Sequence, residues 1–362
     1  MSRESLHTLN TQTLIGYTTK RGHAWHHSHA HQSDEPNHYP HAIPIADVRR
    51  RLFHWTAETS PKKYDVPADP AEATGTDEHG NPIRTITSTD KVLWRSDQPD
   101  VELGTFTADY TPRQYQKVLL DDLAHILTPD GLAVTADTLG IGTAGVLRNG
   151  GRAWVQVETP DTVTTPQGVA FRPFIMAASS HDGSLAVTYT TGSTLVICDN
   201  TMNIALAEAE ASGRRIKIKH TNNDELKIED ARQALEILVE SADQFAADIA
   251  TLCQTPLTDR QFSEFIDIVM PIRDDAGTIA QANDRNKRDL LHSLHDTDPR
   301  ISPWSGTAFG ALQLMNTYRH HHAGIAPGSD RGERNMLHAI TGETRREDTK
   351  ALTAIDRVLA LT

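Results

Sequence analysis

Four positively charged residues lie close together in the middle of the chain, with no acidic residue among them: Arg214, Arg215, Lys217 and Lys219. They belong to the stretch RRIKIKH, whose alternation is typical of a β-strand. Because successive side chains of a strand point to opposite faces, Arg215, Lys217 and Lys219 are expected to share one face. A basic groove is what a protein needs to follow the phosphates of a single-stranded nucleic acid. The pattern therefore predicts such a contact, to which four further residues would contribute: His220, Arg148, Arg152 and Arg172.

Aromatic residues lie on the same predicted strands as these cations. Bases stack on exposed aromatic rings, each contact contributing about 1 to 3 kcal/mol. The alternative is that the rings fill the core of a sheet and that the alternating cations form a solvated sheet face. Both interpretations are open for these four rings: Phe171, Phe174, Trp154 and Tyr189.

Histidines are concentrated in residues 23–41 and suggest metal chemistry. His26 with Asp34 or Glu35 would supply imidazole and carboxylate ligands for zinc or nickel. The spacing matches neither HExxH nor a cysteine pair followed by two histidines, so a surface segment is the simpler interpretation, also for His320, His321 and His322. We therefore predict no metal site from this cluster: His23, His26, His27, His29, His31, His38 and His41.

Two patterns raise the question of enzyme activity. Cys198, Asp199 and His220 suggest a thiol nucleophile with a base, but the apolar run LVIC around Cys198 favours a buried side chain. LGIGTAG contains the spacing GxGxxG, yet a dinucleotide-binding loop lies between a strand and a helix, and strand patterns flank this one on both sides. The sequence predicts neither a catalytic residue nor a cofactor.

Composition limits the class of protein further. The chain has 362 residues, a formal net charge of −13 and two cysteines, too few for a disulfide framework. Its polar amino terminus lacks an apolar run that would form a signal peptide or membrane span. We expect a protein of the cytoplasm of a bacterial host cell that does not interact with membranes. The negative charge disfavours non-specific adhesion to duplex DNA, so any nucleic-acid contact must be local.

Hydrophobic patterning divides the chain into three regions. Residues 1–90 are rich in Pro, His, Thr and Asp and are predicted to form an irregular arm whose best helix covers residues 45–55. Residues 91–222 form a predicted α+β sheet core, with strands at KVLWR and LGTFTADY and a helix over 111–127 that begins with a capping box. Hairpin turns are expected at NGG, 149–151, and at HDG, 181–183. A short helix from Asn200 or Thr201 to Glu210 precedes the basic strand.

Residues 223–362 are predicted to be helical. Apolar residues between 231 and 252 follow a heptad spacing, which suits an oligomer or an internal helix contact. Thr258 and Gln261 form a capping box for a helix over 259–270, and further helices are expected over 277–294, 306–321 and 331–360. The fold class is thus α+β: an antiparallel β-hairpin sheet with a short crossing helix, followed by a helical C-terminal region.

Several segments together resemble the phage and plasmid-like protein family, a domain-of-unknown-function family common in actinobacterial phages and mobile elements. They occur in the order AWHH, VLWRSD, LGTFTADYTPRQYQ, SSHDGSLAVTYT, VICDNTMNIAL, KIKHTNN, NTYRHHH and RGERNMLHAITGE. The resemblance covers roughly residues 15 to 360. It departs at AWH, which family members tend to continue with Gly and a small loop. It implies a mobile-element context and supplies no catalytic residue.

Two functions of different classes remain. The first is a non-enzymatic phage protein of DNA metabolism that binds or anneals single-stranded DNA in recombination, as a homo-oligomer. It is favoured by the hairpin sheet with a following helix and a basic strand, because the single-strand annealing recombinases of phages include proteins of this architecture. The net charge favours an acidic interaction protein that inhibits host restriction or recombination machinery. Salt-sensitive binding of an oligonucleotide would separate the two.

Overall fold

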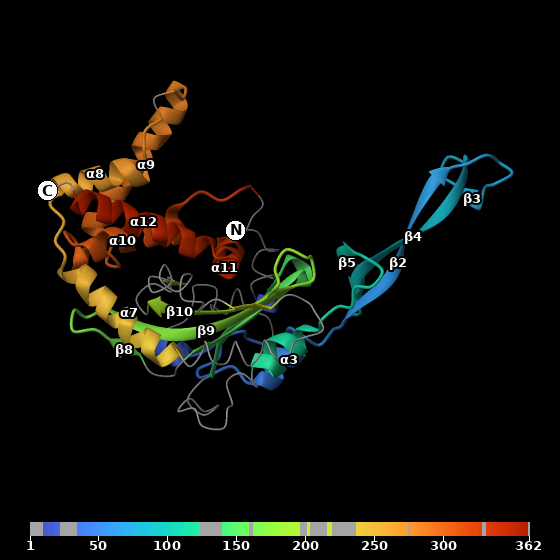
Figure 1. Cartoon of the computed structure of the whole chain (residues 1–362), viewed down its shortest axis with the longest axis horizontal. Coiled ribbons are helices and arrows are strands. Elements are labelled where there is room, and N and C mark those ends of the chain that lie inside the picture. Colours follow the sequence, from blue (N-terminus) through green and yellow to red (C-terminus); the bar gives the residue numbers. More distant parts are fainter. Residues whose placement is uncertain are drawn as a thin grey trace.

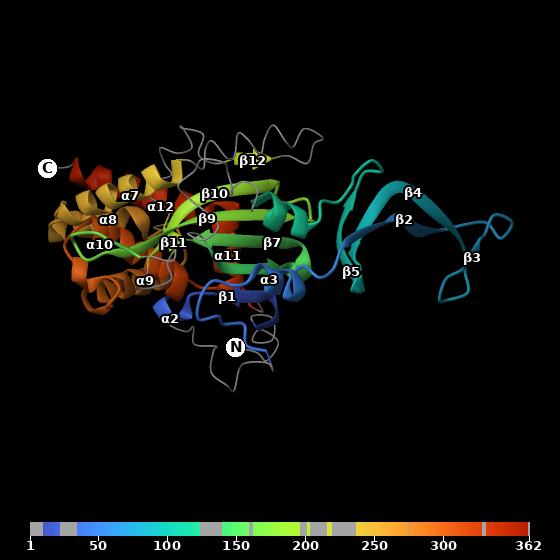
Figure 2. The same ribbon diagram turned by 90° about the horizontal axis from the view of Figure 1, so that it is seen from below.

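A computed structural model of the chain describes residues 10–21, 35–123, 140–158, 162–195, 201–202, 216–218, 237–273, 275–327 and 331–360. A central antiparallel sheet, a group of helices at one end and a projecting β-hairpin arm at the other make up the molecule (Figure 1). The second view also shows the helices and the arm on opposite sides of the central sheet (Figure 2). The α+β class predicted from the sequence is confirmed, including the helical C-terminal region.

Among the described residues the central sheet has eight strands, ordered β1-β6-β7-β9-β10-β11, with β12 also paired to β10 and β8 to β9. All of these pairings are antiparallel. Its strands are β1 Thr13–Ile15, β6 Gly140–Leu147, β7 Arg152–Glu158, β8 Val163–Thr164, β9 Ala170–Ser180, β10 Val187–Leu195, β11 Thr201–Met202 and β12 Ile216–Ile218. The strand predicted at the basic stretch RRIKIKH is therefore present over its three central residues, which form β12.

The two predicted hairpin turns are confirmed. Arg148, Asn149 and Gly150 have φ angles of 50°, 54° and 97°, within the left-handed region that Asn and Gly adopt most readily. These residues form the short 3₁₀ turn η3 between β6 and β7. In the second hairpin Gly183 has a φ of 74°, and Asp182 accepts a hydrogen bond from the Ser184 amide at 2.9 Å.

A second, four-stranded sheet forms the arm. Its strands are β2 Ala57–Pro67, β3 Gly75–Thr76, β4 Pro82–Arg95 and β5 Gln98–Phe106, in the order β2-β4-β3 with β5 also on β4. The pairing of Lys91 with Phe106 confirms the strand pair expected at KVLWR and LGTFTADY. The first 90 residues are thus not an irregular arm throughout, because β1, all of β2, most of β4 and a helix at 45–51 lie within them.

Three described helices precede the carboxy-terminal region: α2 Thr18–Arg21, α3 Ile45–Arg51 and η2 Gln116–Asp121. In the carboxy-terminal region the helices follow the expected order: α7 Ile237–Gln254, α8 Asp259–Val269, α9 Thr278–Thr297, η4 Ser302–Trp304, α10 Ala308–Thr317, η5 Tyr318–His322, α11 Arg331–Thr341 and α12 Glu343–Leu359. The predicted capping box of Thr258 and Gln261 opens α8. None of the described helices is both long and apolar enough to cross a bilayer.

Two helical predictions need correction. The helix expected from Thr111 begins only at Tyr115, because the Gln114 side chain binds the main chain of Ala57 through both its amide oxygen and its amide nitrogen instead of capping a helix. The segment predicted as one helix over 331–360 is two, since Gly342 has a φ of 78° between α11 and α12. The short crossing helix expected over 201–210 lies outside the described residues, apart from Thr201–Met202, which form β11.

Both faces of the central sheet are covered. Ala153, Val155 and Val157 of β7 pack on one face with Val48 and Phe53 around α3 and with Val118 and Leu119 of η2. The alternate residues of β7 face the other way, where Trp154 packs with Phe174, Met176 and Ile340 of α11. A third cluster joins α7 to α12, and Phe171 at the start of β9 belongs to it. Apolar contacts therefore join the sheet to the carboxy-terminal helices at two places, at α11 and at the start of β9.

Candidate functional site

The centre of the predicted basic strand joins the central sheet. Lys217 lies in β12, and its Cα is opposite that of Thr188 in β10. The other members of this predicted site, Arg214, Arg215, Lys219 and His220, lie outside the described residues. The structure thus gives the basic stretch an anchor on the sheet through its backbone.

Three more predicted cations lie near the two hairpin turns and in β9, in different environments. Arg152 is 8% exposed and forms an ion pair with Asp182, from Nε to Oδ2, at 2.9 Å. Arg172 is fully buried, with its Nε 3.9 Å from Oε2 of the buried Glu158. Only Arg148 is exposed. The structure therefore does not bring these three guanidinium groups to one exposed surface, and Arg152 and Arg172 do not line a groove.

The four aromatic residues considered as stacking platforms are core residues. Trp154, Phe171, Phe174 and Tyr189 are each at most 1% exposed. Tyr189 also donates its hydroxyl to the main-chain oxygen of Val118 at 3.1 Å. The interpretation as sheet core is the one that the structure supports.

The GxGxxG spacing has a packing explanation. A Cβ on Gly142 would lie 2.1 Å from Oε1 of Glu158, and a Cβ on Gly145 would lie 2.1 Å from the ring of Trp154. A Cβ on Gly140 would meet the Tyr17 hydroxyl at 2.2 Å. These glycines leave room on β6 for three large neighbouring side chains, and the loop-to-helix geometry of a dinucleotide site is absent because β6 continues through them.

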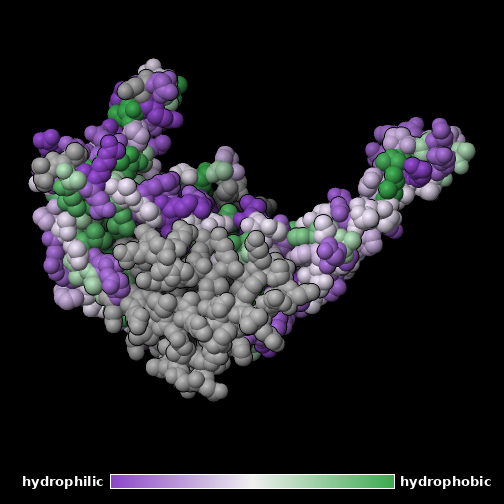
Figure 3. Space-filling view, in the orientation of Figure 1, coloured by the Kyte–Doolittle hydropathy of each residue, from purple (hydrophilic) through white to green (hydrophobic). Residues whose placement is uncertain are grey.

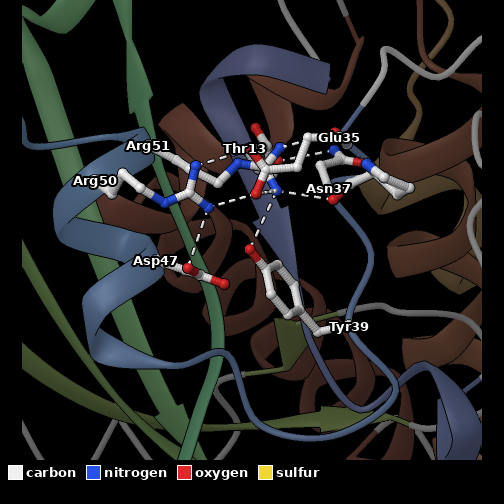
Figure 4. A network of polar contacts seen from close by, with 8 residues as sticks. Thr13, Glu35, Asn37, Tyr39, Asp47, Arg50 and Arg51 are labelled. Carbon is white, nitrogen blue, oxygen red and sulfur yellow. Dashed lines mark hydrogen bonds and ion pairs between the residues drawn. The ribbon is translucent and has the colours of Figure 1, made fainter.

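Glu35, considered as a metal ligand, is instead part of an ion-pair network (Figure 4). Arg50 donates a hydrogen bond from Nη1 to Oε2 of Glu35 at 2.9 Å. Hydrogen bonding to Arg50 lowers the pKa of the Glu35 carboxyl. Arg51 donates to the Tyr39 hydroxyl at 3.1 Å, and Asn37 donates to the Thr13 main-chain oxygen at 2.8 Å. The network fastens residues 35–39 to β1 and α3. Histidines 23 to 31 lie outside the described residues, and those that are described include no metal-binding cluster.

Neither cysteine is part of a described nucleophilic site. Cys198, with Asp199 and His220, lies outside the described residues. Cys253 of α7 is partly buried, and this burial raises the pKa of its thiol to about 11. A thiol of such high pKa has little thiolate at neutral pH.

The first half of α11 holds the π-helical turn η5 by binding its free carbonyl groups. Arg334 donates to the main-chain oxygens of Arg319 and of Gly324, the latter at 3.2 Å. Asn335 donates to the His320 oxygen at 3.1 Å, and Arg331 to the Ala323 oxygen at 2.8 Å. Carbonyl groups at a helix end need such partners. The segments NTYRHHH and RGERNMLH therefore act as one unit.

Two adjoining cavities lie along α12 beside this unit. The larger, about 390 Å³, has an apolar floor of Ile268, Val269 and Met315 under α12. The smaller, about 210 Å³, lies between η5, α11 and α12. Arg319 and Glu347 line both of them. We call these cavities together the α12 groove; its charged lining residues are Arg319, Arg334, Glu343, Glu347, Lys350 and Arg357.

The α12 groove carries an excess of positive charge. Arg319 is neutralised, since its Nη1 lies 3.2 Å from Oδ1 of the buried Asp348. Lys350 lies 2.6 Å from Glu347 but is 70% exposed, and Arg357 is also exposed. Apart from the neutralised Arg319, three cationic and two acidic side chains line the groove, in a chain whose net charge is −13. The groove is suited to an anionic ligand.

A family model described as "Domain of unknown function (DUF932)" matches residues 102–355, more than two thirds of the chain. The chain belongs to the DUF932 family. No curated protein and no solved structure is similar enough to match. The DUF932 match covers the central sheet from β6 onward, most of β5, and the whole α12 groove except Arg357.

Histidines in the DUF932 region of the groove are kept neutral. Burial, with the nearby charges of Arg319 and Arg334, lowers the pKa of His320 to about 3. Burial and Arg334 also lower the pKa of His338. At neutral pH both imidazoles are therefore uncharged and offer one donor and one acceptor each.

Sequence reasoning did not identify the α12 groove. It singled out NTYRHHH and RGERNMLHAITGE only as segments that carry a family resemblance. The signal that was available is the pair of Arg and His residues in each segment, Arg319 with His320 and Arg334 with His338. The residues of the third wall, on α12, follow an ordinary helical charge pattern and gave no signal.

Proposed function

We propose that this DUF932 protein binds single-stranded nucleic acid without catalysing a reaction, in the DNA metabolism of a phage or mobile element, as a homo-oligomer. The observation that carries the proposal is the pairing of β12 with β10, which attaches the acid-free basic stretch around Lys217 to the central sheet. A strand that continues a sheet is a rigid support for a row of cations that follows a phosphate backbone.

The site proposed here is narrower than the one expected from the sequence. Arg152 and Arg172 are used inside the sheet, and the aromatic rings fill its core. The proposed contacts are therefore the basic stretch 214–220 and, near the first hairpin turn, the exposed Arg148. Because the four candidate rings are buried, affinity would rest on phosphate contacts and would depend strongly on salt.

Binding of a fluorescein-labelled oligothymidine, measured by anisotropy, tests the proposal. We expect saturable binding at low salt that is lost in the double substitution K217E/K219E. A matched control is K62E/K63E, which makes the same change of charge on the arm, away from the central sheet. Binding that is unchanged in K217E/K219E, or lost equally in both variants, would overturn the proposal.

The arm gives some support to the second function, an acidic interaction protein that inhibits host restriction or recombination machinery. Residues 68–81 at its tip include Asp69, Glu72, Asp77 and Glu78 and no Lys or Arg. If the protein binds no oligonucleotide at low salt and inhibits a purified host nuclease in proportion to its concentration, this second function is the correct one.

A further inference from the structure

The arm is a β-hairpin that extends away from the rest of its own chain. In the continuously described stretch 61–92 no residue is buried, and Tyr64 is 48% exposed. Figures 1 and 2 show β2, β3 and β4 projecting clear of the central sheet, and Figure 3 shows hydrophobic and hydrophilic residues together on the arm surface. The outer part of the arm consists mainly of β2 paired with β4, and an isolated two-stranded hairpin is only marginally stable in water. Its length and exposure point to a partner.

The tip of the arm has the shape and charge of a ligand. Residues 69–72 form a tight turn in which the Glu72 amide donates to the Asp69 oxygen at 2.9 Å, with Pro70 at the second position, where its fixed φ is favourable. Asp69, Pro70 and Ala71 are exposed. The Glu78 carboxylate, near the second bend of the tip, is 87% exposed. The tip thus presents small apolar groups flanked by carboxylates.

The α12 groove is complementary to this tip. Its larger cavity has an apolar floor and two exposed cations in its lining, Arg357 and Lys350, the latter in an exposed ion pair with Glu347. The floor residues Ile268, Val269 and Met315 come from α8 and α10. A Pro-Ala turn would cover this floor while Asp69 and Glu78 face the cations. Opposite charges at the rim of an interface guide association and fix the register of the partners.

The arm tip lies at one end of the molecule's longest axis, and α8, α10 and α12, which line the larger cavity of the groove, lie toward the other end (Figures 1 and 2). The tip therefore does not reach the groove of its own chain. We propose that the α12 groove binds the arm tip of a second copy of this chain. The contact joins two different surfaces, so it repeats head to tail and produces a closed ring, or a filament where the rotation does not close. The proposal deepens the homo-oligomer part of the proposed function by naming its interface.

Charge reversal with rescue tests this interface, with the full-length chain and without nucleic acid. Sedimentation velocity at micromolar concentration should find oligomers of the natural protein at low salt, and monomers for D69K/E78K and for K350E/R357E. Mixing the two variants should restore oligomers, because the natural tip of one variant meets the natural groove of the other and the two reversed surfaces are also opposite in charge. A matched control, D100K/E102K on the exposed edge of β5, should leave the oligomers unchanged, and circular dichroism should show that every variant is folded.

The proposal is wrong if the natural protein is monomeric at micromolar concentration, or if its oligomers persist in both variants. It is also wrong if the mixed variants remain monomers although each is folded. These outcomes are independent of oligonucleotide binding, because Lys217 and Lys219 are unchanged in every variant. Failure of the interface and failure of the nucleic-acid proposal are therefore distinguishable.

Discussion

Gly145 and Trp154 lie opposite each other in β6 and β7. The indole ring occupies the space that a side chain at position 145 would need, because a Cβ there would lie 2.1 Å from Cη2. Gly145→Ala is expected to reduce the free energy of unfolding by about 1–3 kcal/mol, the usual cost of overpacking. Urea unfolding measures the change.

Gly324→Ala is the control for this substitution, since nothing lies within 4 Å of the added Cβ. Equal stability of the natural protein and Gly145→Ala would contradict the packing role of the glycine and reopen the question of a ligand-binding loop.

His320 makes stability sensitive to mild acid. Its pKa is lowered to about 3 in the folded protein and is about 6.5 when unfolded. Between these values the unfolded chain binds more protons, so stability falls as the pH is lowered from 6.5 towards 3, by at most about 1.4 kcal/mol per pH unit. His320→Gln should flatten this part of the profile in urea unfolding at pH 7, 5.5 and 4.5.

His79→Gln provides the comparison, because the His79 side chain is 76% exposed on the arm. We expect its profile to follow that of the natural protein. If His320→Gln also leaves the profile unchanged, the imidazole is not held neutral by its surroundings.

At the scale of elements, Gly342 determines where α11 ends and α12 begins. Its φ of 78° is in the left-handed region, which costs a residue with a side chain about 1–2 kcal/mol. Gly342→Ala should therefore lower the midpoint of urea unfolding, and Gly324→Ala, with no positive φ, should not. A midpoint above that of the natural protein would mean that α11 and α12 prefer to join as one helix.

Some elements were predictable because burial leaves a pattern in the sequence. The hairpins around residues 149–151 and 181–183 have Asn, Asp and Gly at their turns and apolar strands on both sides, and both are present. The arm was not predictable, since β2 and most of β4 bury neither face and so lack the alternation of apolar and polar residues. The break at Gly342 was missed because apolar residues continue at helical spacing on both sides.

The candidate site shows the same limit. Charge in the sequence identified the basic stretch around Lys217, whose centre forms β12. It also suggested Arg152 and Arg172, because no local pattern shows that Asp182 and Glu158 lie beside them. The α12 groove draws its lining from α8, α10, η5, α11 and α12. Only tertiary packing brings those residues together.

At the scale of the whole molecule, the net charge of −13 and the proposed binding of nucleic acid impose opposite requirements. An acidic chain repels a polyanion at long range, and salt weakens this repulsion as well as the local attraction. An oligomer that repeats the basic stretch would multiply local contacts without changing the overall sign of the charge. The proposed roles of the arm, the groove and the basic strand are therefore compatible with one another.

The most direct test of the central claim is the salt dependence of oligothymidine binding. Each phosphate contact contributes about −0.7 to the slope of log K against log salt concentration for a single strand. K217Q/K219Q should make this slope less steep by about 1.4, while K62Q/K63Q on the arm should leave it unchanged. A slope near zero for the natural protein, or the same slope in K217Q/K219Q, would contradict the claim that this basic strand binds single-stranded nucleic acid.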